Sequence, residues 1–278
     1  MTDLVRAEAL DVSYGGRRGA LGASPGVKVL HGVDVRIGRG ETVGVVGESG
    51  SGKTTLGRAL LRLVEPTAGR ILFDGQDVTH APEDAIRPLR RRMQMIFQDP
   101  MASLNPRHTI RRILAEPLLL HGVAADRTTA ARKVATVLDR VGLPLLVLDR
   151  FPHELSGGQR QRVGIARAVA LEPDFVLADE IVSGLDVSTQ AQVLQLLGGL
   201  TRDMGLAMAF ISHDLSVIRA VCDRVYVMRA GRVVEHGPCE QVFAAPKAAY
   251  TRALLDAIPL PDIDPGWLDR SPDVEDAA

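Results

Sequence analysis

A glycine-rich segment near residue 50 carries the clearest chemical pattern in the sequence. Gly47-Glu48-Ser49-Gly50-Ser51-Gly52-Lys53-Thr54 fits G-x-x-x-x-G-K-[ST] at every defined position. Glycines in such a loop let successive backbone N–H groups point at phosphate oxygens, and the helix that follows aims the positive end of its dipole at the same anion. Lys53 would hold the β- and γ-phosphates of a nucleoside triphosphate, and the Thr54 hydroxyl would ligate Mg²⁺. A glycine-rich surface turn is the alternative interpretation.

Two later segments carry groups that could act on the same kind of ligand. Ser156-Gly157-Gly158-Gln159 joins a good helix-capping residue to two glycines that leave room for an anion near the backbone. The helix behind it would offer its positive end to phosphate, although an ordinary Ser-capped helix could carry the same residues. The apolar run Phe175–Ala178 ends in Asp179 and Glu180. Two acidic residues in that position are also common in loops.

The elements that must position these groups alternate between strand and helix. Residues 42–46 form a short apolar run with β-branched residues, typical of a strand buried on both faces, and lead directly into the glycine-rich loop. Further strands are predicted over 4–14, 33–37, 71–73, 93–97, 175–178, 208–211, 225–228 and 233–235, and helices over 54–64, 156–171, 189–204 and 215–220. This alternation predicts an α/β fold with a mainly parallel sheet that is covered on both faces.

Three stretches interrupt the alternation. From residue 99 to about 151 no strand is evident and helices are predicted over 110–116 and 128–141, which indicates a helical insertion into the α/β body. Residues 15–26 are rich in Gly and Arg and predict a surface hairpin. The tail after Pro259 is rich in Pro and Asp and is predicted to fray.

The bulk composition excludes several classes of protein. The formal net charge is −1, from 33 basic and 34 acidic residues, so no overall basic field draws the molecule to nucleic acid. Cys222 and Cys239 match no zinc or redox spacing. The sequence has no apolar run of about 18 residues and no hydrophobic segment at its N-terminus, which predicts a soluble cytoplasmic protein.

Taken in chain order, these motifs resemble those of the ATPases of ABC transporters over about residues 4–258. Leu155-Ser156-Gly157-Gly158-Gln159 is similar to the signature sequence of that family, and Phe175–Glu180 resembles its Walker B strand. The resemblance implies that Asp179 is a partner of Mg²⁺, through water, and that Glu180 polarises the water that attacks ATP.

Further single residues match the family at the expected spacing. Gln98 matches the Q-loop glutamine, which reaches toward Mg²⁺ and senses the transmembrane partner. His213 matches the switch histidine, which contacts the γ-phosphate, and Ser183-Gly184-Leu185-Asp186 matches the D-loop, which crosses the dimer interface. Tyr14 matches the aromatic residue that stacks on adenine, although a tyrosine that packs on the core from a strand edge also fits the pattern.

The resemblance is greatest to the oligopeptide/dipeptide and nickel importer branch. It is carried by the segments 96–106, 182–194 and 249–255. The chain departs from the usual pattern at Ile181, where the family has Pro, and at Gly184, where it has Ala. Neither change removes a catalytic group. The cysteine cluster that some members carry after the position of Pro259 is missing, so an iron–sulfur site is unsupported.

The resemblance implies a complete architecture and a set of partners. We expect an ABC ATPase domain at 1–258, with a P-loop NTPase (RecA-like) core at about 1–98 and 156–240, an antiparallel N-terminal β part, a helical subdomain at about 99–155, and a short tail at 259–278. A head-to-tail dimer would hold each ATP and its Mg²⁺ between Gly47 to Thr55 of one subunit and Ser156 to Gln159 of the other.

The expected partners are a second ATPase, a sister protein rather than a copy of this chain, and two transmembrane permease subunits at the cytoplasmic face of the inner membrane. An extracytoplasmic solute-binding protein would take part indirectly, and no nucleic acid is expected. The transported solute stays open between peptide, nickel and another small molecule. A DNA-repair or chromosome-organising ATPase would need a long coiled coil, and a translation factor of the superfamily would carry two P-loops, whereas one is found here.

Overall fold

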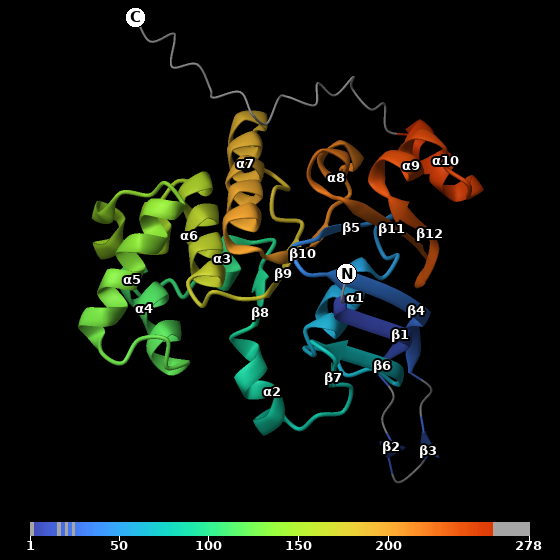
Figure 1. The fold of residues 1–278 in the computed structure, drawn as a ribbon, viewed down its shortest axis with the longest axis horizontal. Coiled ribbons are helices and arrows are strands. Elements are labelled where there is room, and N and C mark those ends of the chain that lie inside the picture. Colours follow the sequence, from blue (N-terminus) through green and yellow to red (C-terminus); the bar gives the residue numbers. More distant parts are fainter. Residues whose placement is uncertain (1–2, 16–17, 20–21, 24–25, 258–278) are drawn as a thin grey trace, which may run out of the picture.

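The computed structural model describes residues 3–15, 18–19, 22–23 and 26–257, and the predicted tail at 259–278 lies outside these ranges (Figure 1). The larger sheet has six strands. Their order across the sheet is β12 (Arg232–Pro238), β11 (Arg224–Arg229), β5 (Thr42–Val46), β10 (Ala207–Ile211), β9 (Phe175–Asp179) and β8 (Met93–Ile96). All neighbours pair in parallel except β11 with β12, so the prediction of a mainly parallel α/β sheet is confirmed.

A second, antiparallel sheet is built from the N-terminal part of the chain. Its order is β4 (Val27–Gly38), β1 (Asp3–Tyr14), β6 (Ala68–Phe73) and β7 (Gln76–Asp77). Strand β4 is longer than the predicted 33–37, because it pairs with β1 along most of its length. Within the predicted hairpin at 15–26, β2 (Arg18–Gly19) pairs with β3 (Gly22–Ala23), and the other residues of that excursion are mostly outside the described ranges.

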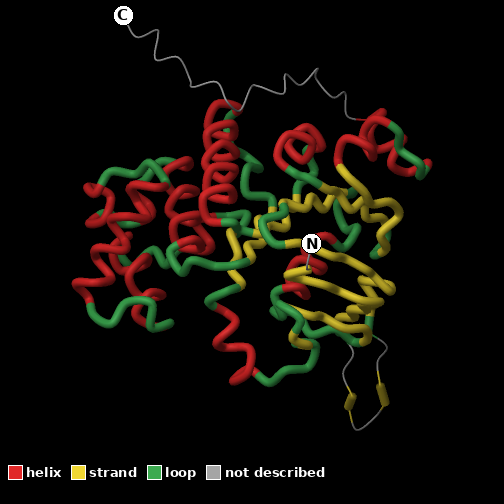
Figure 2. Tube along the Cα trace, viewed as in Figure 1, coloured by secondary structure: helices red, strands yellow, loops and turns green. Residues whose placement is uncertain are grey.

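Helices cover both faces of the parallel sheet (Figure 2). The helices of the described residues are α1 (Lys53–Leu60), α2 (Glu83–Arg90), α3 (Pro100–Ser103), α4 (Ile110–Leu120), α5 (Arg127–Arg140), η1 (Leu145–Asp149), η2 (Pro152–Glu154), α6 (Gly157–Val169), α7 (Val187–Met204), α8 (Leu215–Val221), α9 (Cys239–Ala244) and α10 (Ala249–Ala257). Residues 99–155 form helices and turns without a strand, as predicted. No helix among the described residues is both long and apolar enough to cross a membrane.

The side chains of strand β9 show how the sheet is buried on both faces. Phe175 and Leu177 belong to the core that the parallel sheet shares with the antiparallel sheet. Val176 and Ala178 point to the opposite core, which is formed with α6, α7 and the helices of 99–155. All four are fully buried, so this strand is fixed in register by apolar contacts on each side.

Helix α1, which follows the glycine-rich loop, lies between the two sheets. Leu56 and Leu60 are buried in one cluster with residues of β1, β4, β5 and β9. Gly57 faces the parallel sheet so closely that an added Cβ would come within 2.7 Å of Leu177. This close packing fixes the start of the helix, and with it the loop, relative to the end of strand β9.

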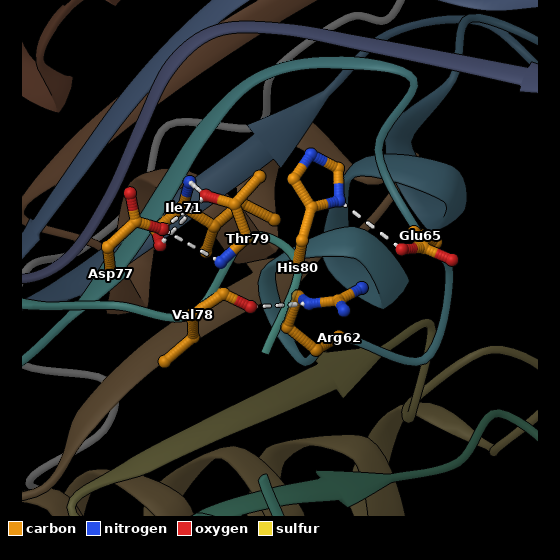
Figure 3. Close-up of polar contacts among 7 residues, drawn as sticks. All are labelled: Arg62, Glu65, Ile71, Asp77, Val78, Thr79 and His80. Atoms are coloured by element: carbon orange, nitrogen blue, oxygen red, sulfur yellow. Dashed lines mark hydrogen bonds and ion pairs between the residues drawn. The ribbon is translucent and has the colours of Figure 1, made fainter. Parts of the chain in front are cut away.

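The far end of α1 is fastened to the antiparallel sheet, as Figure 3 shows. The Nε of Arg62 donates to the carbonyl of Val78 at 2.7 Å. The hydroxyl of Thr79 accepts from the N–H of Ile71 at 2.8 Å and donates to Asp77 Oδ1 at 2.6 Å. The bond of Arg62 therefore holds the helix end to the segment after β7, and the bonds of buried Thr79 fix that segment on β6.

Candidate functional site

The glycine-rich loop follows β5, which lies between β11 and β10 in the sheet. Gly47 has a φ of 147°, and a Cβ there would lie 2.2 Å from the carbonyl oxygen of Met228 on β11. Gly52, the residue before α1, has a φ of 102°, and its Cβ would lie 2.9 Å from Leu30. Both positions therefore require glycine for conformation and for space. The loop that results is a fixed turn at the carboxyl end of a central strand.

Lys53 is folded over this loop. Its Nζ donates to the carbonyl of Gly47 at 2.7 Å and to that of Glu48 at 2.9 Å, and the residue is only 6% exposed. Burial lowers the pKa of Lys53, and the negative charges of Glu180 and Asp179 oppose that shift. Burial has taken water away from the Lys53 ammonium group. A phosphate in the loop would stabilise that positive charge in place of the lost water, so Lys53 is suited to bind an anion.

Asp179 lies at the end of β9 and contacts the start of α1. The hydroxyl of Thr54 donates to Asp179 Oδ1 at 3.3 Å. Asp179 is 4% exposed, and burial raises the pKa of its carboxyl group; the neighbouring Glu180 adds to this rise, while the Thr54 bond, Arg58 and Lys53 oppose it. The carboxylate is therefore held in an environment that favours a nearby cation.

Three predicted residues meet at the ends of three adjacent strands. Gln98 follows β8, Glu180 follows β9 and His213 follows β10. The Nε2 of Gln98 donates to Glu180 Oε2 at 3.0 Å, and His213 Nδ1 lies 3.8 Å from Glu180 Oε1. Ligand sites in parallel α/β sheets lie at the carboxyl ends of the strands, so the convergence has a simple topological origin.

Glu180 occupies an unusual backbone conformation. Its φ is 49°, in the left-handed region that side chains other than glycine rarely adopt, and its N–H donates to the carbonyl of Ile211 at 2.9 Å. Non-glycine residues in this region cost about 1–3 kcal/mol and gather at functional sites. The bond to β10 holds the strained residue in place, which directs its carboxylate toward Gln98 and His213.

A small cavity of about 200 Å³ lies over the loop. Its lining residues are Val29, Ser49, Gly50, Gly52, Lys53, Thr54, Thr55 and Glu180. A neighbouring cavity of about 120 Å³ connects Glu180 to the segment Ser183-Gly184-Leu185 and to His213. Ser51, within the loop, is 4% exposed, and its Oγ has no hydrogen-bond partner among the described residues. The first cavity thus joins the phosphate-binding candidates to the carboxylate of Glu180.

Tyr14 stands at the edge of this region on strand β1. Its hydroxyl lies 3.5 Å from Thr55 Oγ1, and the side chain is 42% exposed. The ring lies beside the loop and is open to solvent, so it is available for stacking. The alternative, a tyrosine packed on the core, does not fit a side chain with this exposure. The stacking of Tyr14 on adenine stays a prediction.

The Ser156 segment is well formed but lies apart from the loop cavity. The N–H of Gln159 donates to Ser156 Oγ at 3.2 Å, and Gln159 Oε1 accepts from the N–H of Ser156 at 3.0 Å, which makes a capping box at the start of α6. Gly158 lies against Thr189 at the start of α7. Among the described residues that line the loop cavity, none belongs to Ser156-Gly157-Gly158-Gln159. One subunit therefore does not bring the two anion sites together.

One contact to the loop was missed in the sequence. The hydroxyl of Tyr250, on α10, accepts a hydrogen bond from the N–H of Glu48 at 3.2 Å. The two residues lie 202 positions apart, and a tyrosine in an amphipathic C-terminal helix gives no signal of such a contact. Only the resemblance of residues 249–255 to a family element could have drawn attention to it.

Comparison with known proteins agrees with this geometry. The sequence profile of the ABC transporter family matches residues 30–183. A provisionally named peptide import ATP-binding protein of Brucella ovis is 57% identical over 240 residues, which are 86% of this chain and 75% of that protein. The oligopeptide transport ATP-binding protein OppF of Bacillus subtilis is 48% identical over 240 residues, covering 86% of this chain and 78% of that protein.

Solved structures give the same result. The structure of cbiO1 from Clostridium perfringens, part of the ABC transporter complex cbiONQ, has a TM-score of 0.77 and 28% identity, and the match covers 93% of this chain and 97% of that one. The dimeric ATP-binding cassette MJ0796 bound to ADP and Pi has a TM-score of 0.75 and 28% identity, covering 84% and 98%. With its P-loop, its carboxylate pair and this extent of similarity, the chain belongs to the ATP-binding proteins of the ABC transporter family.

Proposed function

We propose that this chain is the ATP-hydrolysing subunit of an importer of peptides or similar small solutes, which acts through separate membrane subunits. The observation that carries the ATPase assignment is the convergence of Gln98 and His213 on Glu180, which lines the cavity over the P-loop. The choice of peptides follows the names of the relatives, among them OppF of Bacillus subtilis.

The phosphates of ATP would lie over Gly47 to Thr55. The amides of Ser49, Gly50 and Gly52 would face phosphate oxygens, whereas the N–H of Ser51 donates to the carbonyl of Glu48 at 3.2 Å. Lys53 would leave the carbonyls of Gly47 and Glu48 to contact the β- and γ-phosphates. The pKa of Lys53 is lowered because burial removes water from its charged group, so contact with a phosphate oxygen would offset this desolvation cost. Tyr14, beside Thr55, would stack on the adenine ring.

The donor set beside Lys53 fits Mg²⁺. Thr54 would supply a hard oxygen ligand, and Gln98 can add an amide oxygen. Asp179, 3.3 Å from the Thr54 hydroxyl, would act through a bound water. The Asp179 carboxyl group is buried with a raised pKa, so a cation would relieve an existing electrostatic cost. When bound, Mg²⁺ would supply charge neutralisation at the β- and γ-phosphate oxygens.

Glu180 is placed to orient the attacking water. Its Oε2 accepts from Gln98 and its Oε1 faces His213, so the carboxylate is held from two sides while it borders the loop cavity. A water that donates to Glu180 would attack the γ-phosphorus in line as the bond to the ADP oxygen breaks, and His213 would support the departing phosphoryl oxygens.

A second subunit would complete the site. The capped N-terminus of α6 at Ser156 offers open N–H groups but does not line the loop cavity of its own chain. A head-to-tail dimer would bring Ser156 to Gln159 of one subunit against the γ-phosphate held by the other, and closing it would exclude water and strengthen the electrostatics. We propose a related sister ATPase as the partner rather than a second copy.

A large groove is suited to the membrane subunits. It encloses about 1250 Å³ and runs from Gln98 and Asp179 along the helices of 99–155, with exposed apolar side chains such as Phe97 and Leu120 on its walls. Because Gln98 belongs both to the groove and to the Glu180 contact, a permease segment seated there would sense nucleotide state. The chain would thus work peripherally, at the cytoplasmic face of the membrane.

The geometry of residues 99–155 also bears on the rival functions. The longest helix in that stretch is α5, with 14 residues. A chromosome-organising ATPase would carry a long coiled coil there, and the described residues provide none.

Uptake of a radiolabelled tetrapeptide by the native host tests the proposed function. Disruption of the gene should abolish uptake, the wild-type chain should restore it, and Glu180→Gln should not. Glu172→Gln, which removes a surface carboxylate 3.4 Å from Lys133, is the matched control and should restore uptake. Normal peptide uptake in the disrupted strain would contradict peptide import, and loss of ⁶³Ni²⁺ uptake instead would assign nickel.

A further inference from the structure

The C-terminal helix α10 contacts the backbone of the P-loop. The hydroxyl of Tyr250 accepts from the N–H of Glu48, the second residue of the loop, at 3.2 Å. The carbonyl of the same residue receives Lys53 Nζ at 2.9 Å. Glu48 is therefore held from one side by α10 and from the other by the lysine that would bind ATP.

Tyr250 is itself held firmly over the sheet. The guanidinium carbon of Arg229, at the end of β11, lies 4.8 Å from the centroid of the Tyr250 ring, in a cation–π arrangement. Gly47 packs against the carbonyl of Met228, the residue before Arg229, so closely that a Cβ on Gly47 would lie 2.2 Å from that oxygen. The tyrosine ring and the first residue of the loop are thus packed against the same end of the same strand.

The start of α10 has a second attachment, on β12. Glu235 accepts from the N–H of Lys247 at 2.7 Å and from that of Ala248 at 3.0 Å. Although burial opposes the shift, hydrogen bonds hold the pKa of Glu235 below its usual value, so the carboxylate stays charged and keeps the helix in place at neutral pH. The start of α10 is therefore tied to β12, independently of the contact between Tyr250 and the P-loop.

We propose that Tyr250 is a positioning residue for ATP binding, which uses its hydroxyl to hold the Glu48 end of the P-loop and so couples α10 to nucleotide affinity. The inference rests on the proposed ATPase function. In the free protein Lys53 bonds to Glu48 and Gly47, and it must leave both carbonyls to reach a phosphate. During that exchange Tyr250 still holds the Glu48 N–H at one end of the loop, while the N–H of Ser51 still donates to the Glu48 carbonyl at 3.2 Å.

Tyr250→Phe tests the inference because it removes the hydroxyl and keeps the ring on Arg229. We expect the Kd for ATP, measured by calorimetric titration, and the KM for hydrolysis to rise about two- to tenfold, the range that one neutral hydrogen bond supplies. The kcat should stay within twofold, since Tyr250 touches none of the residues placed around the γ-phosphate.

Tyr226→Phe is the matched control. It removes a hydroxyl that accepts from the N–H of Arg36 at 3.0 Å and donates to its carbonyl at 3.3 Å, away from the P-loop. It should lower the Tm without changing the Kd for ATP. An unchanged Kd in Tyr250→Phe, or a lower kcat with an unchanged KM, would overturn the inference. If the wild-type chain failed to bind ATP, the proposed function would fail instead.

Discussion

Replacement of Asp179 by Asn tests how much the buried charge destabilises the nucleotide-free protein and how much it contributes to Mg²⁺ binding. The Asn side chain keeps the size of Asp179 and an oxygen that can accept the 3.3 Å bond from Thr54, but it carries no charge. Because Asp179 is 4% exposed and burial raises its pKa, the ionised carboxylate destabilises the nucleotide-free protein at neutral pH. We therefore expect Asp179→Asn to increase the free energy of unfolding by about 0.5–2 kcal/mol, a size typical of single stabilising substitutions.

The pH dependence of stability is a second check that Asp179→Asn stabilises the protein. A carboxyl group whose pKa is raised by folding contributes stability below its unfolded value of 3.8 and loses it as pH rises through the folded pKa. The advantage of Asp179→Asn over the wild type should thus be largest at pH 7–8 and should shrink as the pH falls toward 4. For a domain of this size, each kcal/mol corresponds to about 2–4 °C in Tm.

Thermal unfolding in EDTA, without nucleotide, is the appropriate assay. Asp174→Asn is the control of opposite sign, because it breaks the surface ion pair with Arg92 and should lower stability by at most about 1 kcal/mol. In the presence of ATP, Asp179→Asn should bind Mg²⁺ about 10–100-fold more weakly, as expected when a group that supports the metal is lost. A variant no more stable than the wild type at pH 8 would refute the electrostatic reasoning.

Two substitutions test how the site is supported. Gly57→Ala places a methyl group 2.7 Å from Leu177 and 3.0 Å from Ile211, so overpacking of about 1–3 kcal/mol should exceed the gain in helix propensity and lower the Tm. The control Gly199→Ala, which has open space around it in α7, should raise the free energy of unfolding by about 1 kcal/mol. A higher Tm in both variants would be inconsistent with close packing of α1 on the sheet. Ser156→Ala should cost about 1 kcal/mol in denaturant unfolding through loss of the α6 cap, with no change in ATP affinity of the isolated subunit by calorimetry; weaker ATP binding there would contradict the assignment of Ser156 to the partner's ATP.

The convergence of three candidate site residues could be predicted because each follows a strand whose hydrophobic pattern is unmistakable. Gln98, Glu180 and His213 lie within two residues of the ends of β8, β9 and β10, and parallel strands bring such positions to one edge of the sheet. Their family roles came from the resemblance, and the structure adds that Glu180 contacts both of the others. The positive φ of Glu180 had no sequence signal, since it arises from the bond to Ile211 across the sheet.

Boundaries and distant contacts were predicted less well. Helix α1 ends at Leu60 rather than at Val64, because Arg62 takes a positive φ of 53° and its side chain is drawn to Val78. Helix α2 was missed because it is short, has Pro88 inside it and buries few residues. In both cases tertiary contacts override local propensity, and no pattern within a short window reports them.

The most direct test of the ATPase mechanism is hydrolysis by the purified chain and by Glu180→Gln, each with Mg²⁺ and ATP, combined with sizing in ATP. The mechanism predicts that the variant binds ATP as tightly as the wild type, that its hydrolysis rate falls at least 100-fold, and that ATP stabilises its dimer, with the sister ATPase added if needed. Hydrolysis by Glu180→Gln at the wild-type rate would contradict the role of Glu180 at the end of β9.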